Sequence, residues 1–172
     1  MHLYALAAIL LSTLCLTSAY ALSPEDEFTA AGCPDTTSPY ASHSDQLAAW
    51  EDFTSMLYNE KRITEAFDKY VAAGYINHSP LVPGNGANTT IAELSQIVPN
   101  VNSDLQRAYV GWDRNGTAFG TAHTKVTGGG AIGIPDSALV DIIRMVGTCL
   151  VEHWDVEQST EGSHPNPIAF FF

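Results

Sequence analysis

The apolar residues of this 172-residue chain change their spacing near Pro99, and that change limits the folds open to it. Before Pro99, apolar side chains recur every three or four residues, which is typical of helices packed through one face. After Pro99 they alternate with polar ones, which is typical of half-buried strands. Helices followed by consecutive strands predict an α+β fold with helices packed on one face of a curved antiparallel sheet. A curved sheet closed by helices forms a cone with one open end, and a small-molecule pocket is expected there.

Capping and turn signals predict where these elements lie. We expect three helices, beginning at Asp45 after an N-cap at Ser44, running from Ile63 until Gly74 stops it, and opening with the capping box Thr90-x-x-Glu93. We expect four strands, over residues 105–113, 117–126, 138–146 and 149–157. A two-residue turn at Gly147-Thr148 would set Asp141 opposite Trp154 and place both on one face with Ile143 and Glu152.

The first 21 residues contain no Asp, Glu, Lys or Arg, and their apolar run is followed by Ala19-Tyr20-Ala21. This pattern indicates a cleaved signal peptide over residues 1–21, with an uncleaved membrane anchor as the alternative. We therefore predict a secreted, extracellular protein with no membrane partner after cleavage. The remaining chain divides into an extended arm over 22–44, one domain over 45–157 and a tail over 158–172.

The charged residues all lie beyond the predicted signal peptide, with 7 bases against 19 acids and a net charge of -12. So acidic a surface is a poor partner for a phosphate backbone, and we expect no nucleic-acid partner. Cys33 and Cys149 remain after signal cleavage, and an oxidising compartment favours a disulfide between them, the alternative being two unrelated thiols. Asn88 and Asn115 begin sequons and are the predicted glycosylation sites.

The titratable residues most open to a chemical role are Asp141 and three histidines, His78, His123 and His153. An aspartate in the middle of an apolar strand is costly without a partner, so Asp141 is either a general base or half of a structural pair. Each histidine is a candidate acid, base or hydrogen-bond donor, or else a structural residue. Only His153-x-Asp155 has a metal-like local spacing, which is common by chance, and we expect no metal site.

Four motifs in this order support a family resemblance: Glu65-Ala66-Phe67-Asp68-Lys69-Tyr70-Val71, Tyr75-Ile76-Asn77-His78-Ser79-Pro80, Asp141-Ile142-Ile143-Arg144 and Val151-Glu152-His153-Trp154-Asp155-Val156. From about Asp45 to Glu157 the chain resembles the SnoaL-like polyketide cyclase group of the nuclear-transport-factor-2-like superfamily, most closely the branch predicted to catalyse aldol condensation. The resemblance implies a cone-shaped α+β barrel with a deep apolar pocket. It also implies no cofactor, and often a homodimer formed through the sheet.

Characterised relatives perform acid/base chemistry at carbons next to carbonyls, as cyclisation, isomerisation or dehydration. The resemblance implies that Asp141 abstracts an α-proton while His78 or His123 stabilises the enolate oxygen. The predicted pocket residues are Trp154, Glu152, Ile143 and Tyr109. The ligand would be a small apolar or carbonyl-containing molecule. The alternative is a non-catalytic secreted module on the same fold that binds a small molecule or a protein, because a fold does not determine a function.

Overall fold

The computed structural model describes residues 32–166 and 168–171, so the predicted signal peptide and the first part of the arm lie outside the described residues. Three α-helices occur there: α2 (His43–Thr54), α3 (Ile63–Tyr70) and α4 (Ala87–Ile97). The shorter turns are the π-helix η1 (Ser55–Asn59) and the 3-10 helices η2 (Val98–Asn100) and η3 (Gly129–Ile132). The strands are β1 (Val71–Asn77), β2 (Asn102–Trp112), β3 (Ala118–Thr127), β4 (Ser137–Val146) and β5 (Cys149–Ser159).

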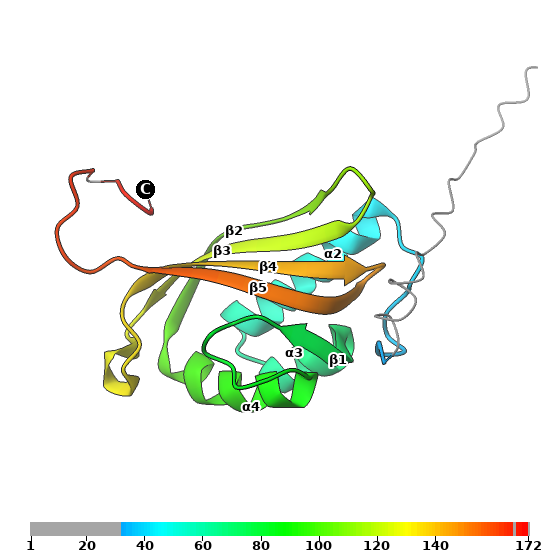
Figure 1. The fold of residues 1–172 in the computed structure, drawn as a ribbon, viewed down its shortest axis with the longest axis horizontal. Helices are drawn as coiled ribbons and strands as arrows, with labels where there is room; N and C mark the ends of the chain where they lie inside the picture. The colour runs from blue at the N-terminus through cyan, green and yellow to red at the C-terminus, as the bar shows by residue number, and fades with distance from the viewer. Residues whose placement is uncertain (1–31, 167, 172) are drawn as a thin grey trace, which may run out of the picture.

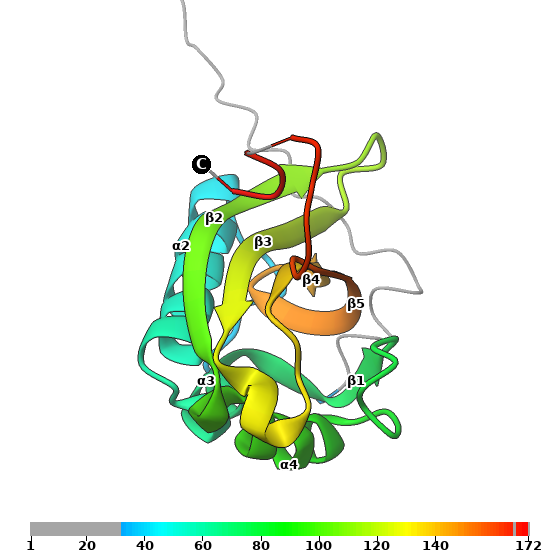
Figure 2. The ribbon, with the colours of Figure 1, turned by 90° about the vertical axis from the view of Figure 1, so that its left-hand side faces the viewer.

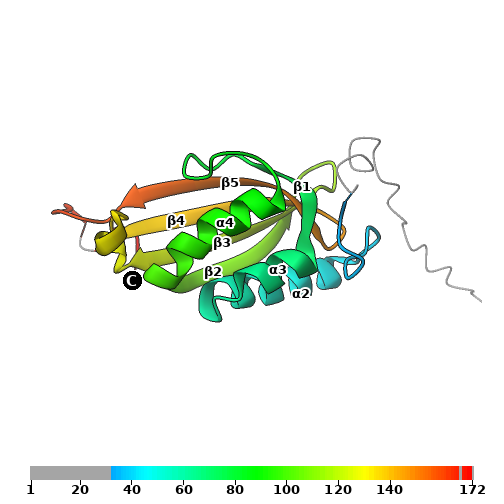
Figure 3. The same cartoon turned by 90° about the horizontal axis from the view of Figure 1, so that it is seen from below.

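The described strands form one sheet in the order β1-β5-β4-β3-β2, with β1 parallel to β5 and the other neighbours antiparallel. The sheet is strongly curved, and the three helices lie against one face of it (Figure 1, Figure 3). Figure 2 looks along the strands and shows the sheet wrapping part of the way around the space above α4. The predicted α+β cone is therefore confirmed. No helix in the described part of the chain is both long and apolar enough to span a membrane.

Helix α2 supplies the centre of the core. Its N-cap is Ser42, whose Oγ accepts from the backbone N–H of Asp45 while an Asp45 carboxylate oxygen accepts from the backbone N–H of Ser42. The predicted N-cap at Ser44 is therefore wrong by two residues. Trp50 is fully buried against β3, where a Cβ on Gly120 would lie only 2.5 Å from its ring. Gly120 thus lets the helix approach the sheet closely.

The chain between α3 and α4 departs most from the sequence prediction. Gly74 does not stop a helix, because α3 ends at Tyr70 and the chain runs directly into β1, which contains Gly74. Alternation is weak in this short strand, so only its pairing with β5 reveals it. Helix α4 begins at Ala87 rather than at a Thr90 cap. The buried Thr90 hydroxyl instead donates to the Gly86 carbonyl, 3.3 Å away.

The hairpin β4–β5 turns at Gly147-Thr148 as predicted. Its register shifts by one residue between Met145 and Arg144. Met145 faces Leu150 and Arg144 faces Glu152, so Val151 is an extra residue on β5. A one-residue shift moves every later side chain to the opposite face. The predicted pairing of Asp141 with Trp154 is therefore wrong: Asp141 faces Asp155, and Trp154 faces Ile142.

The described parts of the arm and of the tail are held against the sheet. Cys33 is joined to Cys149 by the expected disulfide, and the Ser38 carbonyl accepts from the backbone N–H of Thr148 at 2.9 Å. At the other end the tail lies on the side of the sheet away from α4 (Figure 2), where the Phe171 ring stacks on His123 with centroids 5.4 Å apart. The predicted glycosylation sites Asn88 and Asn115 are both exposed.

Candidate functional site

A cavity of about 120 Å³ lies between the helices and the inner face of the sheet. A single water needs only about 10–15 Å³ by the same kind of measure, so a small organic molecule fits. The walls are mostly apolar and come from every layer of the fold: Phe53, Leu57, Phe67, Leu94, Val98 and Ile143 are among them. An apolar cavity with few polar groups is the usual form of a small-molecule site.

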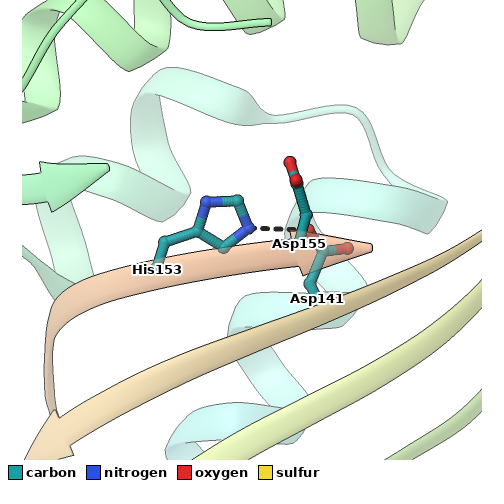
Figure 4. A group of neighbouring side chains, drawn as sticks. All are labelled: Asp141, His153 and Asp155. Carbon is teal, nitrogen blue, oxygen red and sulfur yellow. Dashed lines mark hydrogen bonds and ion pairs between the residues drawn. The ribbon is translucent and has the colours of Figure 1, made fainter. Parts of the chain in front are cut away.

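The acidic residues and the histidine that line the cavity lie on β4 and β5. Asp141, His153 and Asp155 project from the same face of these strands (Figure 4). His153 Nε2 lies 2.8 Å from Asp141 Oδ1, and one ligand-type atom from each of the three residues lies within 4.8 Å of the others. Asp141 is 8% exposed and His153 is 9% exposed. The extra residue Val151 makes this cluster, because it turns His153 and Asp155 toward Asp141.

Tyr58 holds the other oxygen of Asp141. It comes from η1, and its hydroxyl donates to Asp141 Oδ2. Burial, followed by the charge and the hydrogen bond of Asp141, raises the pKa of Tyr58 well above its ordinary value. Tyr58 therefore stays protonated at neutral pH and serves as a fixed donor to the carboxylate.

Asn77 determines which nitrogen of His153 carries a proton. Asn77 Oδ1 accepts from the backbone N–H of Ser79 at 2.9 Å, and its Nδ2 donates to the Thr90 hydroxyl at 3.1 Å, so the amide orientation follows from its partners. His153 Nδ1 lies 3.0 Å from that same Oδ1. Because an amide oxygen only accepts, Nδ1 must be the protonated donor. The orientation of His153 is thus set by the end of β1.

The contact between His153 and Asp141 therefore holds one proton that the two groups share. With Nδ1 protonated, a neutral His153 presents a lone pair at Nε2 to Asp141 Oδ1. A 2.8 Å contact then requires a proton between the two atoms. The pair is either imidazolium with carboxylate or neutral imidazole with carboxylic acid, and its net charge is zero in both. A carboxylate and an imidazole are the side chains that general acid/base catalysis most often uses.

Tyr75 adds a donor with no protein partner. Its side chain is 2% exposed and lines the cavity, and its ring stacks on His153 with centroids 6.3 Å apart. Its hydroxyl makes no hydrogen bond to any described residue. Within the described ranges only the Thr124 hydroxyl is fully buried and unpartnered, so the Tyr75 hydroxyl keeps accessible surface, which faces the cavity. Burial, then the charges of Asp141 and Asp155, raises the pKa of Tyr75.

Several predicted site residues lie on the outer face of the sheet instead. Of the predicted catalytic and pocket residues, Asp141 and Ile143 line the cavity. The ring of His78 stacks on Trp154 with centroids 5.1 Å apart, and its Nε2 lies 2.9 Å from a Glu152 oxygen. Glu152 and Trp154 belong to the outer face because of the shift at Val151.

The predicted residues of β2 and β3 also point outward. His123 faces Val140 across the strands, its Nδ1 lies 2.9 Å from an Arg107 nitrogen, and its ring stacks on Phe171. Burial, then the charge of Arg107, lowers the pKa of His123. Tyr109 is 54% exposed on the same face. The structure therefore brings neither residue, nor His78, to Asp141.

No motif or spacing in the sequence connects Tyr58, Tyr75 and Asn77 to Asp141. Uninterrupted alternation from the Gly147-Thr148 turn predicts Glu152 and Trp154 beside Asp141, and it therefore puts His153 and Asp155 on the opposite face. One local signal marks the shift: Cys149, Leu150 and Val151 are consecutive apolar residues in a strand that otherwise alternates. Three such residues in a row break the period of two, and an inserted residue has the same effect on a strand. No comparable signal connects η1 or β1 to Asp141.

Asp141, His153 and Asp155 have the residue types and spacing that could hold a metal ion. Their hydrogen bonds compete with that use. Tyr58 occupies one oxygen of Asp141, and the shared proton occupies the other oxygen and His153 Nε2. A metal ion would have to displace both.

No protein-family model matches the sequence, and no curated protein matches it either. Solved structures with a similar fold include TsrD from Streptomyces laurentii, at 20% identity and a TM-score of 0.47, covering 64% of this chain and 88% of that one. A candidate polyketide cyclase from Bacillus cereus ATCC 10987 is 21% identical with a TM-score of 0.49, covering 66% and 74% of the two chains.

A candidate SnoaL-like polyketide cyclase from Jannaschia sp. CCS1 is 12% identical, with a TM-score of 0.45, covering 67% of this chain and 90% of that one. Identities and TM-scores of this size describe a partial likeness of fold. Membership of the SnoaL-like group and of its aldol-condensation branch stays a prediction.

Proposed function

We propose that this chain is an acid/base catalyst that moves a proton at a carbon next to the carbonyl group of a small, mainly apolar molecule. The observation that carries the proposal is the buried Asp141–His153 pair, which shares one proton at the polar end of an apolar cavity. Tyr58 and Asn77 hold the pair in place from two other elements. Positioned pairs of this kind are what general acid/base catalysis requires.

The reaction begins when the ionised form of Asp141 takes the α-proton of the substrate. The electron pair of the broken C–H bond moves into an enolate, whose negative charge rests on the former carbonyl oxygen. The Tyr75 hydroxyl supplies the hydrogen bond to that oxygen. The imidazolium of His153 balances the charge of Asp141 before the transfer. Return of the proton from Asp141 to another atom gives isomerisation. Attack of the enolate carbon on a second carbonyl of the same molecule gives cyclisation, and the alkoxide formed there takes the proton back from Asp141.

The test is exchange of carbon-bound protons with solvent. A panel of small ketones and β-keto esters is incubated with the protein in D2O, and loss of each α-proton signal is followed by NMR. Asp141→Asn should reduce the enzymatic exchange rate by about 10²-fold or more, because general-base catalysis typically contributes that much. Asp104→Asn removes the same charge from an exposed residue outside the cavity and should leave the rate unchanged.

The second candidate function is non-catalytic binding of a small molecule in the same cavity, which the apolar walls support equally well. A retained ligand that shows no exchange, with binding unchanged by Asp141→Asn, would replace catalysis by this function. Soaking the protein in a metabolite extract and identifying what stays bound by mass spectrometry supplies the ligand. If the cavity retains nothing, a protein-binding module becomes the remaining alternative.

We also propose that the protein is secreted. The Cys33–Cys149 disulfide supports this, because such bonds persist in oxidising compartments. Expressed in a eukaryotic secretory host, the mature chain should begin at Leu22 and carry glycans on Asn88 and Asn115. Intact-mass and peptide analysis of the secreted protein checks all three points, and retention of residues 1–21 would contradict the proposal.

A homodimer through the outer face of the sheet is a further proposal. Tyr109 and Val156 leave 54% and 65% of their surface exposed on this face. Analytical ultracentrifugation should find a dimer that Val156→Glu dissociates, and a monomer at all concentrations would refute it.

A further inference from the structure

We propose that the ligand of this cavity is an organic cation, a protonated amine whose ammonium group pairs with Asp155. The inference deepens the proposed function by naming the chemical class of molecule that the same cavity takes. It depends on that function only in placing the ligand beside the Asp141–His153 pair.

Two of the carboxylates that line the cavity, Asp155 and Glu157, have no cation beside them among the described residues. Asp141, Asp155, Glu157 and His153 line it, and among the described residues no lysine or arginine does. Asp141 and His153 share one proton and cancel each other's charge. Glu157 is exposed and accepts a hydrogen bond from the Ser137 hydroxyl at 2.6 Å. Asp155 is therefore the carboxylate that is both partly withdrawn from water and without a hydrogen-bond partner among the described residues.

Asp155 makes no hydrogen bond and no ion pair with any described residue, although it is only partly exposed. A carboxylate that is partly withdrawn from water into apolar surroundings costs free energy until it gains a partner. An ammonium group supplies that partner through a charge-assisted hydrogen bond. A neutral ligand leaves Asp155 unpaired, and an anionic ligand is repelled by it.

The aromatic residues of the cavity favour the same class of ligand. Phe53, Tyr58, Phe67 and Tyr75 contribute to its lining. The faces of aromatic rings attract cations when water is excluded. The negative charge of Asp155 is one of the charges that raise the pKa of the Tyr75 hydroxyl. Carboxylate and aromatic faces together form a site for an amine with an apolar body.

A metal ion is the competing cation, and the hydrogen bonds of the cluster argue against it. A metal site needs lone pairs from Asp141 and His153 as well as from Asp155. The shared proton already uses the one lone pair of His153 Nε2, which a metal ion would need. An ammonium group needs only the unpartnered carboxylate and leaves the Asp141–His153 pair intact.

This placement limits the substrate of the proposed reaction. Asp155 lies within 4.8 Å of the atoms that would move the proton. The amine nitrogen must therefore lie within a few bonds of the reacting carbon. The substrate class is a small carbonyl compound that also carries an amine, with the rest of its body apolar.

The test compares three probes of similar shape and different charge by isothermal titration calorimetry: benzylamine, benzyl alcohol and benzoate at constant ionic strength. Benzylamine should bind about tenfold more tightly than benzyl alcohol, the value of one partly buried charged hydrogen bond, and benzoate should bind most weakly. Asp155→Asn should remove the advantage of benzylamine and leave the Kd of benzyl alcohol within about twofold. Asp104→Asn removes an exposed charge and should change none of the three.

Equal affinity for the three probes, a preference for benzoate, or an unchanged preference in Asp155→Asn would each overturn the proposal. Zinc binding that Asp155→Asn abolishes, with no amine preference in the wild type, would assign the cluster to a metal. If Asp155→Asn fails to fold, the three-probe comparison on the wild-type protein still decides. Binding is measured without turnover, so loss of amine preference and loss of Asp141-dependent proton exchange are separate results.

Discussion

Each face of the sheet carries a carboxylate that is held by a histidine and one other side chain, but the charge of that other side chain differs between the two faces. On the inner face Asp141 lies between Tyr58 and His153. On the outer face Glu152 lies between Arg144 and His78, at 2.9 Å from each. Each carboxylate thus has one histidine and one further donor. The difference is that the outer donor is a permanent cation, whereas the inner donor is a neutral hydroxyl.

That difference separates a carboxylate held by a permanent cation from one held by a hydroxyl and a histidine. Burial alone would raise the pKa of Glu152, but hydrogen bonds from His78 and Arg144 hold it below its usual range. Glu152 therefore stays ionised at neutral pH and acts as a structural ion. Asp141 has no cation beside it other than the one that His153 becomes when it takes the shared proton. A carboxylate in that setting is suited to proton transfer.

Replacing the histidine of each cluster should give the largest difference between them, measured as the rate of α-proton exchange. His153→Ala should reduce α-proton exchange by about 10²-fold, because it removes one of the two groups that share the proton. His78→Ala should leave exchange unchanged, since its side chain contacts Glu152 and Trp154 on the outer face. NMR in D2O measures both variants. The reverse result would restore His78 to the catalytic role that its motif predicts.

The outer cluster should contribute measurably to the free energy of unfolding. Glu152→Ala removes the carboxylate from a largely buried ion pair with Arg144 and should lower the free energy of unfolding by about 2 kcal/mol. Glu152→Gln keeps the shape and part of the hydrogen bonding and should cost less. Urea unfolding followed by fluorescence measures both. Equal stability of Glu152→Ala and wild type would mean that the outer cluster is an incidental surface contact.

Removing the inner donor should have an intermediate effect. Tyr58→Phe deletes the hydroxyl that positions Asp141 without changing the ring. We expect exchange to fall about tenfold, the value of one charged hydrogen bond, while the cavity keeps its shape. Tyr70→Phe is the matched control, because its hydroxyl also donates to an aspartate, Asp52, outside the cavity. Similar rates in the two variants would show that Tyr58 does not act on Asp141.

The smallest effect concerns acid stability. The pKa of Glu152 is lower in the folded chain than in the unfolded chain, so its contribution is fully present above its ordinary pKa. That contribution is lost as the pH falls from the ordinary value through the lower folded value. Between pH 7 and pH 3, the wild type should therefore lose more unfolding free energy than Glu152→Gln. Identical losses in denaturant titrations at the two pH values would refute the prediction.

Much of the fold could be predicted from local patterns. The four long strands, the Gly147-Thr148 turn and the helices α2 and α3 follow from the spacing of apolar residues, with errors at the caps. Strand β1 could not be predicted, because its pairing with β5 is a contact between distant segments. The site divides in the same way. Asp141 stands out as an acid in an apolar strand, whereas Tyr58 and Asn77 reach it only through the packing of η1 and β1.

The sequence by itself determined the order of helices and strands, the pair of cysteines available for a disulfide, and the presence of an aspartate that needs a partner. Each depends on residue type or on spacing within one segment. Only the tertiary structure decided which histidine that partner is. The extra residue Val151 inverts the faces of β5 beyond it and brings His153, rather than Glu152 and Trp154, into the cavity. The three consecutive apolar residues at the start of β5 mark a break in alternation, but the hydrogen bonds between strands decide which residue is the extra one.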